Sequence, residues 1–431
     1  MDQEELPSPL ARAAADRAPD PYAVLRIRDF TLYLVGRLVA SFGQQMLVVA
    51  VGWELYERTG SALNLGLVGL TQMVPMILGT LPAGHVADNF ERKRVILAMI
   101  AVIAAASLGL TLISALHAPV GWTYACLFVA GAARTFLWPA SAAFLPYLVP
   151  RPLFSRAVTW NSGAFHLSSV AGPAAGGALI ALTHSAVPVY AFNVAAALFC
   201  FVMVALIRSR HTVTRREPMT LGSLLAGFKF VFQNRIIFGT ITLDMFAVLL
   251  GGATALLPVY ARDILQAGPG GLGLLQAAMP AGAVVCALIL AHRPPLERAG
   301  RALLWAVTAF GVATIVFGVS KWFWLSFAML FVCGAVDNVS VVIRHTLVQL
   351  LSPDEKRGRV SAVNSLFIGT SNELGGFRAG VVAHLFGPAL ANPLVTGAII
   401  SVVSGGVGTI LVVAAVALIW PEIRRYGRLD G

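Results

Sequence analysis

Four ionisable residues lie near the middle of long apolar stretches of this sequence: Arg134, Asp244, Asp337 and Glu373. A charged side chain at the centre of a bilayer costs at least about 2.5 to 3.5 kcal/mol on insertion scales, so each needs a partner or a role. A buried carboxyl group can take up a proton and give it up again when a cation approaches. We therefore predict proton exchange at Asp244 or Glu373. Asp337 and Arg134 are further candidates, and a structural ion pair between helices is the alternative for each residue.

The spacing of these residues limits how they can pair. Asp337 and Arg344 are seven positions apart, almost two full helical turns, so they share a helix face and can pair directly or through water. Glu373 and Arg378 are five apart, roughly 140° around a helix, which indicates different partners. Arg134 and Asp337 occupy equivalent positions in an internal repeat described below. That repeat predicts opposite charges across a pseudo-two-fold axis.

A dense charge cluster, "GHVADNFERKRVI" at residues 84 to 96, lies between two apolar runs. A glycine at its start lets one helix approach a neighbour closely. An acid here can lie at a helix N-terminus, while the bases pair with acids and with lipid phosphates. The residues of interest are Gly84, Asp88, Arg92, Lys93 and Arg94.

A second motif, "GPAAGG" at residues 172 to 177, combines small residues with a proline. Gly172 and Gly176 are spaced to form a small face on which another helix can pack, and Gly177 follows directly. Pro173 removes one backbone hydrogen bond and allows the helix to bend. Generic helix packing is the alternative to a functional role.

The elements that hold these residues are long apolar helices. The composition is 58% hydrophobic and 12% charged, with a mean hydropathy of +0.79, which is wrong for a water-facing surface. A bilayer core of about 30 Å needs about 20 apolar residues per helix. The sequence therefore predicts an all-α membrane protein with twelve transmembrane helices. Their approximate spans are 30–56, 62–83, 95–116, 120–147, 158–182, 186–207, 235–260, 271–292, 302–319, 323–349, 359–386 and 392–419.

The basic residues follow the membrane. The net charge of +11 would suggest nucleic acid in a soluble protein, but most of the 31 Lys and Arg residues lie in the two tails and in the even-numbered loops. By the positive-inside rule, both termini are cytoplasmic, which agrees with an even number of spans. The first 28 residues contain no apolar stretch, so no cleavable signal is expected, and this tail is expected to be disordered.

The chain divides into two halves. We predict a cytoplasmic tail at 1–28, six-helix halves at 29–207 and 235–420, a linker with an amphipathic membrane-surface helix at 208–234, and a cytoplasmic tail at 421–431. A shift of 203 positions aligns Gly172 with Gly375 and Gly177 with Gly380. Two pseudo-symmetric halves of this kind are the architecture of alternating-access transporters.

These motifs resemble those of the major facilitator superfamily. The charge cluster at 84–94 matches its signature loop between helices 2 and 3, with Glu91 in place of a frequent glycine. The resemblance implies that this cluster latches the cytoplasmic side of the halves in the outward-open state, and a plain topology signal is the alternative. "GPAAGG" is similar to the antiporter motif of the export branch. Arg134 takes the place of an arginine linked to proton coupling, with Trp138 where a glycine is expected.

Three segments resemble the group within this superfamily that contains enterobactin and macrolide exporters. They are "VADNFERKRVIL", "LGSLLAGFKFVF" and "RHTLVQLLSPDEKRGRVSAVNSL". The resemblance implies a monomeric, multi-pass inner-membrane protein that exports a small siderophore-like or drug-like molecule in exchange for protons. An importer or facilitator on the same fold is the alternative, and a non-transporting receptor is a third.

Several further residues are candidates for the substrate cavity. Arg134 and Arg378 can contact anionic groups, and Arg37 is a third intramembrane base. His166 titrates in the physiological range, although a hydrogen-bonding packing role is the alternative. Trp138 and Phe377 could stack on a catecholate or macrocycle, with core packing or lipid contact as the alternative.

Enzymatic function has little support in the sequence. No Walker loop, HExxH motif or nucleophile elbow is present, so we expect neither a catalytic centre nor ATP-driven transport. No cofactor and no metal site are expected. The four cysteines lie in apolar segments without metal-ligand spacing, and we expect them to be packing residues: Cys126, Cys200, Cys286 and Cys333.

Overall fold

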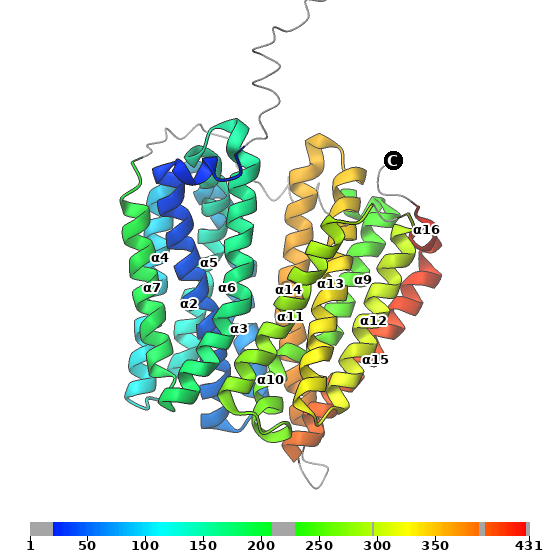
Figure 1. The fold of residues 1–431 in the computed structure, drawn as a ribbon. Coiled ribbons are helices and arrows are strands. Elements are labelled where there is room, and N and C mark those ends of the chain that lie inside the picture. Colours follow the sequence, from blue (N-terminus) through cyan, green and yellow to red (C-terminus); the bar gives the residue numbers. More distant parts are fainter. Residues whose placement is uncertain (1–19, 209–228, 295–296, 388–392, 428–431) are drawn as a thin grey trace, which may run out of the picture.

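The computed structural model describes residues 20–208, 229–294, 297–387 and 393–427, and within them the chain is helical with no strand (Figure 1). The first half consists of α2 (Arg28–Thr59), α3 (Ala62–Asn89), α4 (Arg92–Ala115), α5 (Gly121–Leu148), α6 (Phe154–Thr183) and α7 (Val187–Ala205). The second consists of α9 (Arg235–Gly251), α11 (Gly268–Ala291), α12 (Ala299–Val319), α13 (Phe323–Leu351), α14 (Asp354–Phe386) and α15 (Pro393–Ile419). Short turns η3 (Ala253–Leu256), α10 (Leu257–Val259) and η4 (Tyr260–Ile264) extend α9, while η1 (Ala23–Arg26), η2 (Arg151–Leu153) and α16 (Pro421–Arg425) lie at helix ends.

Eleven of the described helices are long and apolar enough to cross a membrane. The twelfth expected span is α14, which at 33 residues is long enough but too polar to qualify. It packs against α3, α9 and α15, so protein rather than lipid can receive its polar side chains. Prolines lie inside α3, α5, α6 and α11, where each removes one backbone hydrogen bond of its helix.

The two halves repeat one packing scheme. In the first half α2 packs on α6 and α7, α3 on α5, and α4 on α5 and α7. In the second half α9 packs on α14 and α15, α11 on α13, and α12 on α13 and α15. The pairs correspond one to one, which confirms the predicted pseudo-symmetric architecture. The exact domain limits, such as 207 and 235, remain predictions.

The halves meet at one end of the molecule and lie apart at the other (Figure 1). We call the end that carries Arg28, Asn89 and Trp420 the terminus side, and the end that carries Thr59, Leu116 and Thr183 the loop side. One apolar cluster, which includes Tyr56, Ile180, Tyr260 and Phe317, spans both halves. Three further clusters each stay within one half, which leaves the halves separable toward the terminus side.

Glycines lie at two close helix crossings between the halves. A Cβ added at Gly177 on α6 would lie 2.9 Å from the Cα of Gly273 on α11. A Cβ added at Gly380 on α14 would lie 2.9 Å from the Cα of Gly66 on α3. Gly177 and Gly380 are the repeat-related pair found by the shift of 203 positions, and each lets its helix cross a helix of the other half closely.

Two sequence-based predictions fall on other parts of the chain. The amphipathic helix expected in the linker lies mostly at 209–228, outside the described residues, and only its end at 229–233 is seen to be helical. The N-terminal tail expected to be disordered lies outside them up to residue 19. From residue 20 the tail folds against the first half, where the Arg156 side chain donates a hydrogen bond to the Asp20 carbonyl at 2.7 Å.

Candidate functional site

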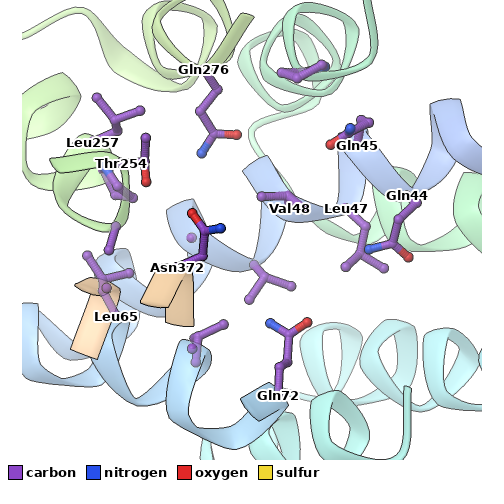
Figure 2. A pocket seen from close by; sticks show the side chains of 18 of the residues that line it. Gln44, Gln45, Leu47, Val48, Leu65, Gln72, Thr254, Leu257, Gln276 and Asn372 are labelled. Atoms are coloured by element: carbon purple, nitrogen blue, oxygen red, sulfur yellow. The ribbon is translucent and has the colours of Figure 1, made fainter. Parts of the chain in front are cut away.

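A cavity of about 470 Å³ lies between the two halves (Figure 2). Helices α2, α3, α5 and α6 line it from the first half, and η3, α10, α11 and α14 line it from the second. Its walls are mostly apolar, with amide side chains from both halves directed into the same space. These amides belong to Gln44, Gln45, Gln72, Gln276 and Asn372.

The amides supply hydrogen-bonding groups to the cavity. Gln45 donates to the Ser169 hydroxyl at 3.1 Å, and Asn372 donates to its own helix at the Ile368 carbonyl at 2.9 Å. Within the described residues, the side chains of Gln44, Gln72 and Gln276 form no hydrogen bond to another protein group. An amide has both donors and acceptors, so these three suit a ligand with several neutral polar groups. Sequence reasoning missed all five, although an amide inside an apolar span was a signal that could have identified them.

Arg134 and Glu373 place opposite charges in this cavity. Arg134 lies on α5 of the first half and donates through Nε to the Ala130 carbonyl at 3.3 Å. Glu373 lies on α14 of the second half, and its carboxylate packs against Gly69 of α3, where an added Cβ would lie 2.9 Å from Oε2. The two charges interact electrostatically, yet no direct ion pair within 4.0 Å joins them in the described structure. Both therefore keep polar atoms available to a ligand.

The other two predicted carboxylates lie away from this cavity. Asp244 on α9 forms a buried ion pair with Arg344 on α13, and Arg344 also donates to the Ser340 hydroxyl at 3.2 Å. The sequence allowed Arg344 to pair with Asp337 on the same helix face, but Asp244 of the neighbouring helix takes that position instead. Asp337 lines a separate cavity of about 90 Å³, which shares Asn372 with the larger one.

The repeat predicted that Arg134 and Asp337 place opposite charges across the pseudo-symmetry axis, but in the structure these two residues line different cavities. The acid that faces Arg134 across the cavity is Glu373. The sequence predicted different partners for Glu373 and Arg378; Arg378 has one on another helix, whereas Glu373 has no direct partner among the described residues. Arg378 turns to α15, where it donates to the Ser401 carbonyl at 3.2 Å.

A second cavity, of about 340 Å³, lies wholly among helices of the first half. Arg37 on α2 and Trp138 on α5 line it, and both were predicted cavity residues. It adjoins the first cavity, and four residues line both. These are Gln44, Gln45, Val48 and Arg134.

Three predicted cavity residues line neither space in the described structure. Arg378 lies between α14 and α15, packed beside Gly405. Phe377 is half-buried near Gly66 of α3. His166 is exposed on α6 and its ring contacts Phe165 edge-on at 5.9 Å between centroids. Any role for them in binding substrate remains a prediction.

The described side chains of the charge cluster at 84–94 contact other residues of the first half. The Arg92 guanidinium is buried over the ring of Tyr147 at 4.8 Å. Lys93 donates to the last carbonyls of α7 and the following turn, at Ala205 (2.9 Å) and Ile207 (2.6 Å). Arg94 pairs with Glu91 at 2.6 Å. Gly84 lies in the last turns of α3, and the side chain of Asp88 lies outside the described residues. These contacts fix α4 to α5 and α7, and the predicted latch remains a prediction.

The "GPAAGG" motif packs on both halves. A Cβ at Gly172 would lie 2.6 Å from the Gln45 side chain, and one at Gly176 would lie 2.9 Å from the Met46 backbone, both on α2. This confirms the predicted close-packing face. Gly177 faces α11 instead, and Pro173 is buried beside the central cavity. The motif therefore reaches the cavity wall and the contact between the halves.

Comparisons with known proteins agree with this fold. A model of the transmembrane secretion effector family matches residues 19–417. The chain belongs to this family of major facilitator superfamily proteins. It is 25% identical over 408 residues to the enterobactin exporter EntS of Escherichia coli O1:K1 / APEC, covering 92% of this chain and 93% of that one. The protein of the same name from Shigella boydii serotype 18 matches to the same extent.

Solved transporters share the fold at low sequence identity. A bacterial homolog of the human lysosomal transporter Spinster, in an inward-facing and unoccupied conformation, superposes with a TM-score of 0.67 at 14% identity, covering 93% of this chain and 97% of that one. The nucleoside transporter NupG gives 0.71 at 11% identity, covering 91% and 100%. This family member is thus a membrane transporter of the major facilitator type and not an enzyme.

Proposed function

We propose that this protein exports a small amphiphilic organic molecule across the inner membrane by alternating access, in exchange for protons. The supporting observation is the pair Arg134 and Glu373, which come from different halves and face one cavity without a direct ion pair. A residue from each half at the substrate space is what couples ligand binding to the relative movement of the halves.

Competition between a proton and the substrate for the Glu373 carboxylate would exchange one for the other. When deprotonated, the carboxylate attracts Arg134 and accepts hydrogen bonds from substrate hydroxyl or amine groups. When protonated, it loses its charge and attracts both more weakly. A proton that arrives from the opposite side therefore favours substrate release, and substrate binding favours proton release. This mutual exclusion is the requirement for antiport.

We further propose that the terminus side faces the cytoplasm. The concentration of Lys and Arg in the tails and the terminus-side loops supports this orientation through the positive-inside rule. The described conformation, closed at the loop side, would then be inward-facing. The Spinster homolog that shares the fold was solved in an inward-facing conformation, which is consistent with the proposal.

The cargo we propose is siderophore-like, and drug-like macrocycles are the competing class. The name of the enterobactin exporter supports the first class. Five amides around a largely apolar space suit a molecule with many neutral donors and acceptors on an apolar frame, and both classes fit that description.

Uptake into inside-out vesicles with an imposed pH gradient tests this proposal. Labelled enterobactin and labelled erythromycin would be offered in parallel to the wild type and to Glu373→Gln. We expect gradient-driven accumulation of one compound by the wild type and a loss of at least about 10-fold in Glu373→Gln, because the amide cannot exchange a proton.

Glu57→Gln is the matched control, because Glu57 is exposed near the loop-side end of α2 and lines neither cavity. It should transport at the wild-type rate. Equal gradient-driven uptake by wild type and Glu373→Gln would remove Glu373 from the coupling step. Accumulation that does not depend on the gradient would overturn proton exchange itself.

A further inference from the structure

Among the described residues, no carboxylate forms an ion pair with Arg37. It lies on α2 within the first half, and no carboxylate lines the cavity that it faces. Its only hydrogen bond in the described structure is from Nη1 to the Ser141 hydroxyl, at 3.4 Å. Its buried Nε atom has no partner. The guanidinium also lies over the Tyr33 ring, whose centroid is 5.9 Å from Cζ.

The rest of this cavity is built for an apolar group. Branched aliphatic side chains of α4 form one wall, and Trp138 and Phe165 contribute aromatic surface. The polar side chains among its lining residues are neutral apart from Arg37 and Arg134. The aliphatic residues of α4 are Ile96, Ile100 and Ile103.

A guanidinium kept in an apolar site without a counter-ion costs free energy unless a ligand supplies the charge. An anionic oxygen would satisfy the unpartnered Nε and replace the long bond to Ser141 by a charge-assisted one. We propose that the cavity at Arg37 is a second subsite, which binds an anionic group next to an aromatic or aliphatic part of the transported molecule. The remainder of the molecule extends past Gln44 to Arg134 in the central cavity. This inference rests on the proposed transport function and narrows its substrates to amphiphiles with an acidic group.

Equilibrium binding of two matched probes tests the subsite. The anionic probe is 1-anilinonaphthalene-8-sulfonate, and the neutral probe is N-phenyl-1-naphthylamine, which is the same ring system without the sulfonate. Both would be titrated by fluorescence against the full chain in zwitterionic nanodiscs, with empty nanodiscs subtracted. We expect Arg37→Gln to weaken binding of the sulfonate by about 10-fold or more and to leave the neutral probe unchanged, because a charge-assisted contact is lost.

Two further variants keep the result interpretable. Arg37→Lys should retain part of the preference for the sulfonate, since it keeps the charge but not the planar donors. Arg28→Gln, an exposed arginine at the start of the same helix, should bind both probes as the wild type does. Equal loss of both probes in Arg37→Gln, unchanged sulfonate binding, or no saturable binding by the wild type would overturn the subsite. The binding assay uses no pH gradient. Its result therefore does not depend on whether the vesicle experiment supports proton exchange.

Discussion

Among the intramembrane carboxylates, the partner of each one determines what it can do. Asp244 is held in a buried ion pair with Arg344, whereas Glu373 faces a cavity and has no direct partner in the described structure. A carboxylate that must exchange protons and contact substrate needs access to both. The geometry therefore favours Glu373 for coupling and a structural role for Asp244.

Replacement of Asp244 should consequently reduce stability more than transport. Asp244→Asn leaves the buried Arg344 charge without its ion-pair partner, and breaking a buried pair in this way typically costs about 3 to 5 kcal/mol. We expect a thermal unfolding midpoint several degrees lower in detergent, with vesicle uptake per folded molecule close to that of the wild type.

The double variant Asp244→Asn with Arg344→Gln is the control for this prediction. It removes both charges and should recover part of the lost stability, which a double-mutant cycle would measure. Loss of uptake in Asp244→Asn at unchanged thermal stability would instead assign the coupling role to Asp244.

At the scale of helices, the crossings of α6 with α11 and of α3 with α14 hold the halves together at the loop side. Gly177 lies in the first crossing, where an added Cβ would press on the backbone of α11. Backbone atoms cannot rotate away, so one helix must shift.

Gly177→Ala should therefore weaken the conformation that is closed at the loop side. We expect a cavity cysteine, introduced as Val48→Cys on a background without native cysteines, to react several-fold faster with a membrane-impermeant maleimide from the loop side. Gly163→Ala is the matched control, because an added Cβ on this other glycine of α6 meets nothing within 4 Å. An unchanged reaction rate in Gly177→Ala would show that this crossing does not hold the closed conformation.

The helices were predicted from the sequence more fully than the cavity. The apolar runs of the sequence predicted twelve spans, and eleven of the described helices are long and apolar enough to cross a membrane, whereas α14 is more polar. The cavity amides were not predicted, since one sequence does not show how each helix is rotated. Gln72 and Gln276 are visible as amides in apolar spans, but only the packing of α3 and α11 shows that both face one cavity. The position of Glu373 opposite Arg134 likewise depends on contacts between halves.

At the scale of the whole molecule, the sequence repeat predicts two halves but not the state in which they are found. Both the loop-open and the loop-closed arrangements use the same helices, and they differ in contacts between the halves. In the described conformation, Tyr56 at the end of α2 donates a hydrogen bond from its hydroxyl to the Asp263 carboxylate of η4. Arg262 adds a bond to the Tyr56 carbonyl at 3.3 Å and lies 5.6 Å from its ring centroid.

Removal of one hydroxyl from this contact should shift the whole molecule toward the loop-open state. A hydrogen bond to a charged group contributes about 1.5 to 3 kcal/mol, so Tyr56→Phe should change the equilibrium by roughly 10- to 100-fold. Spin labels at Leu182→Cys and Lys321→Cys lie on opposite halves at the loop side. Double electron–electron resonance would report the loop-open state as a new population at longer distance between them. Tyr124→Phe is the control, because its hydroxyl bonds to the Asn64 carbonyl within the first half. It should leave the distances unchanged, and the same result for Tyr56→Phe would mean that the apolar cluster and the glycine crossings alone hold the halves closed.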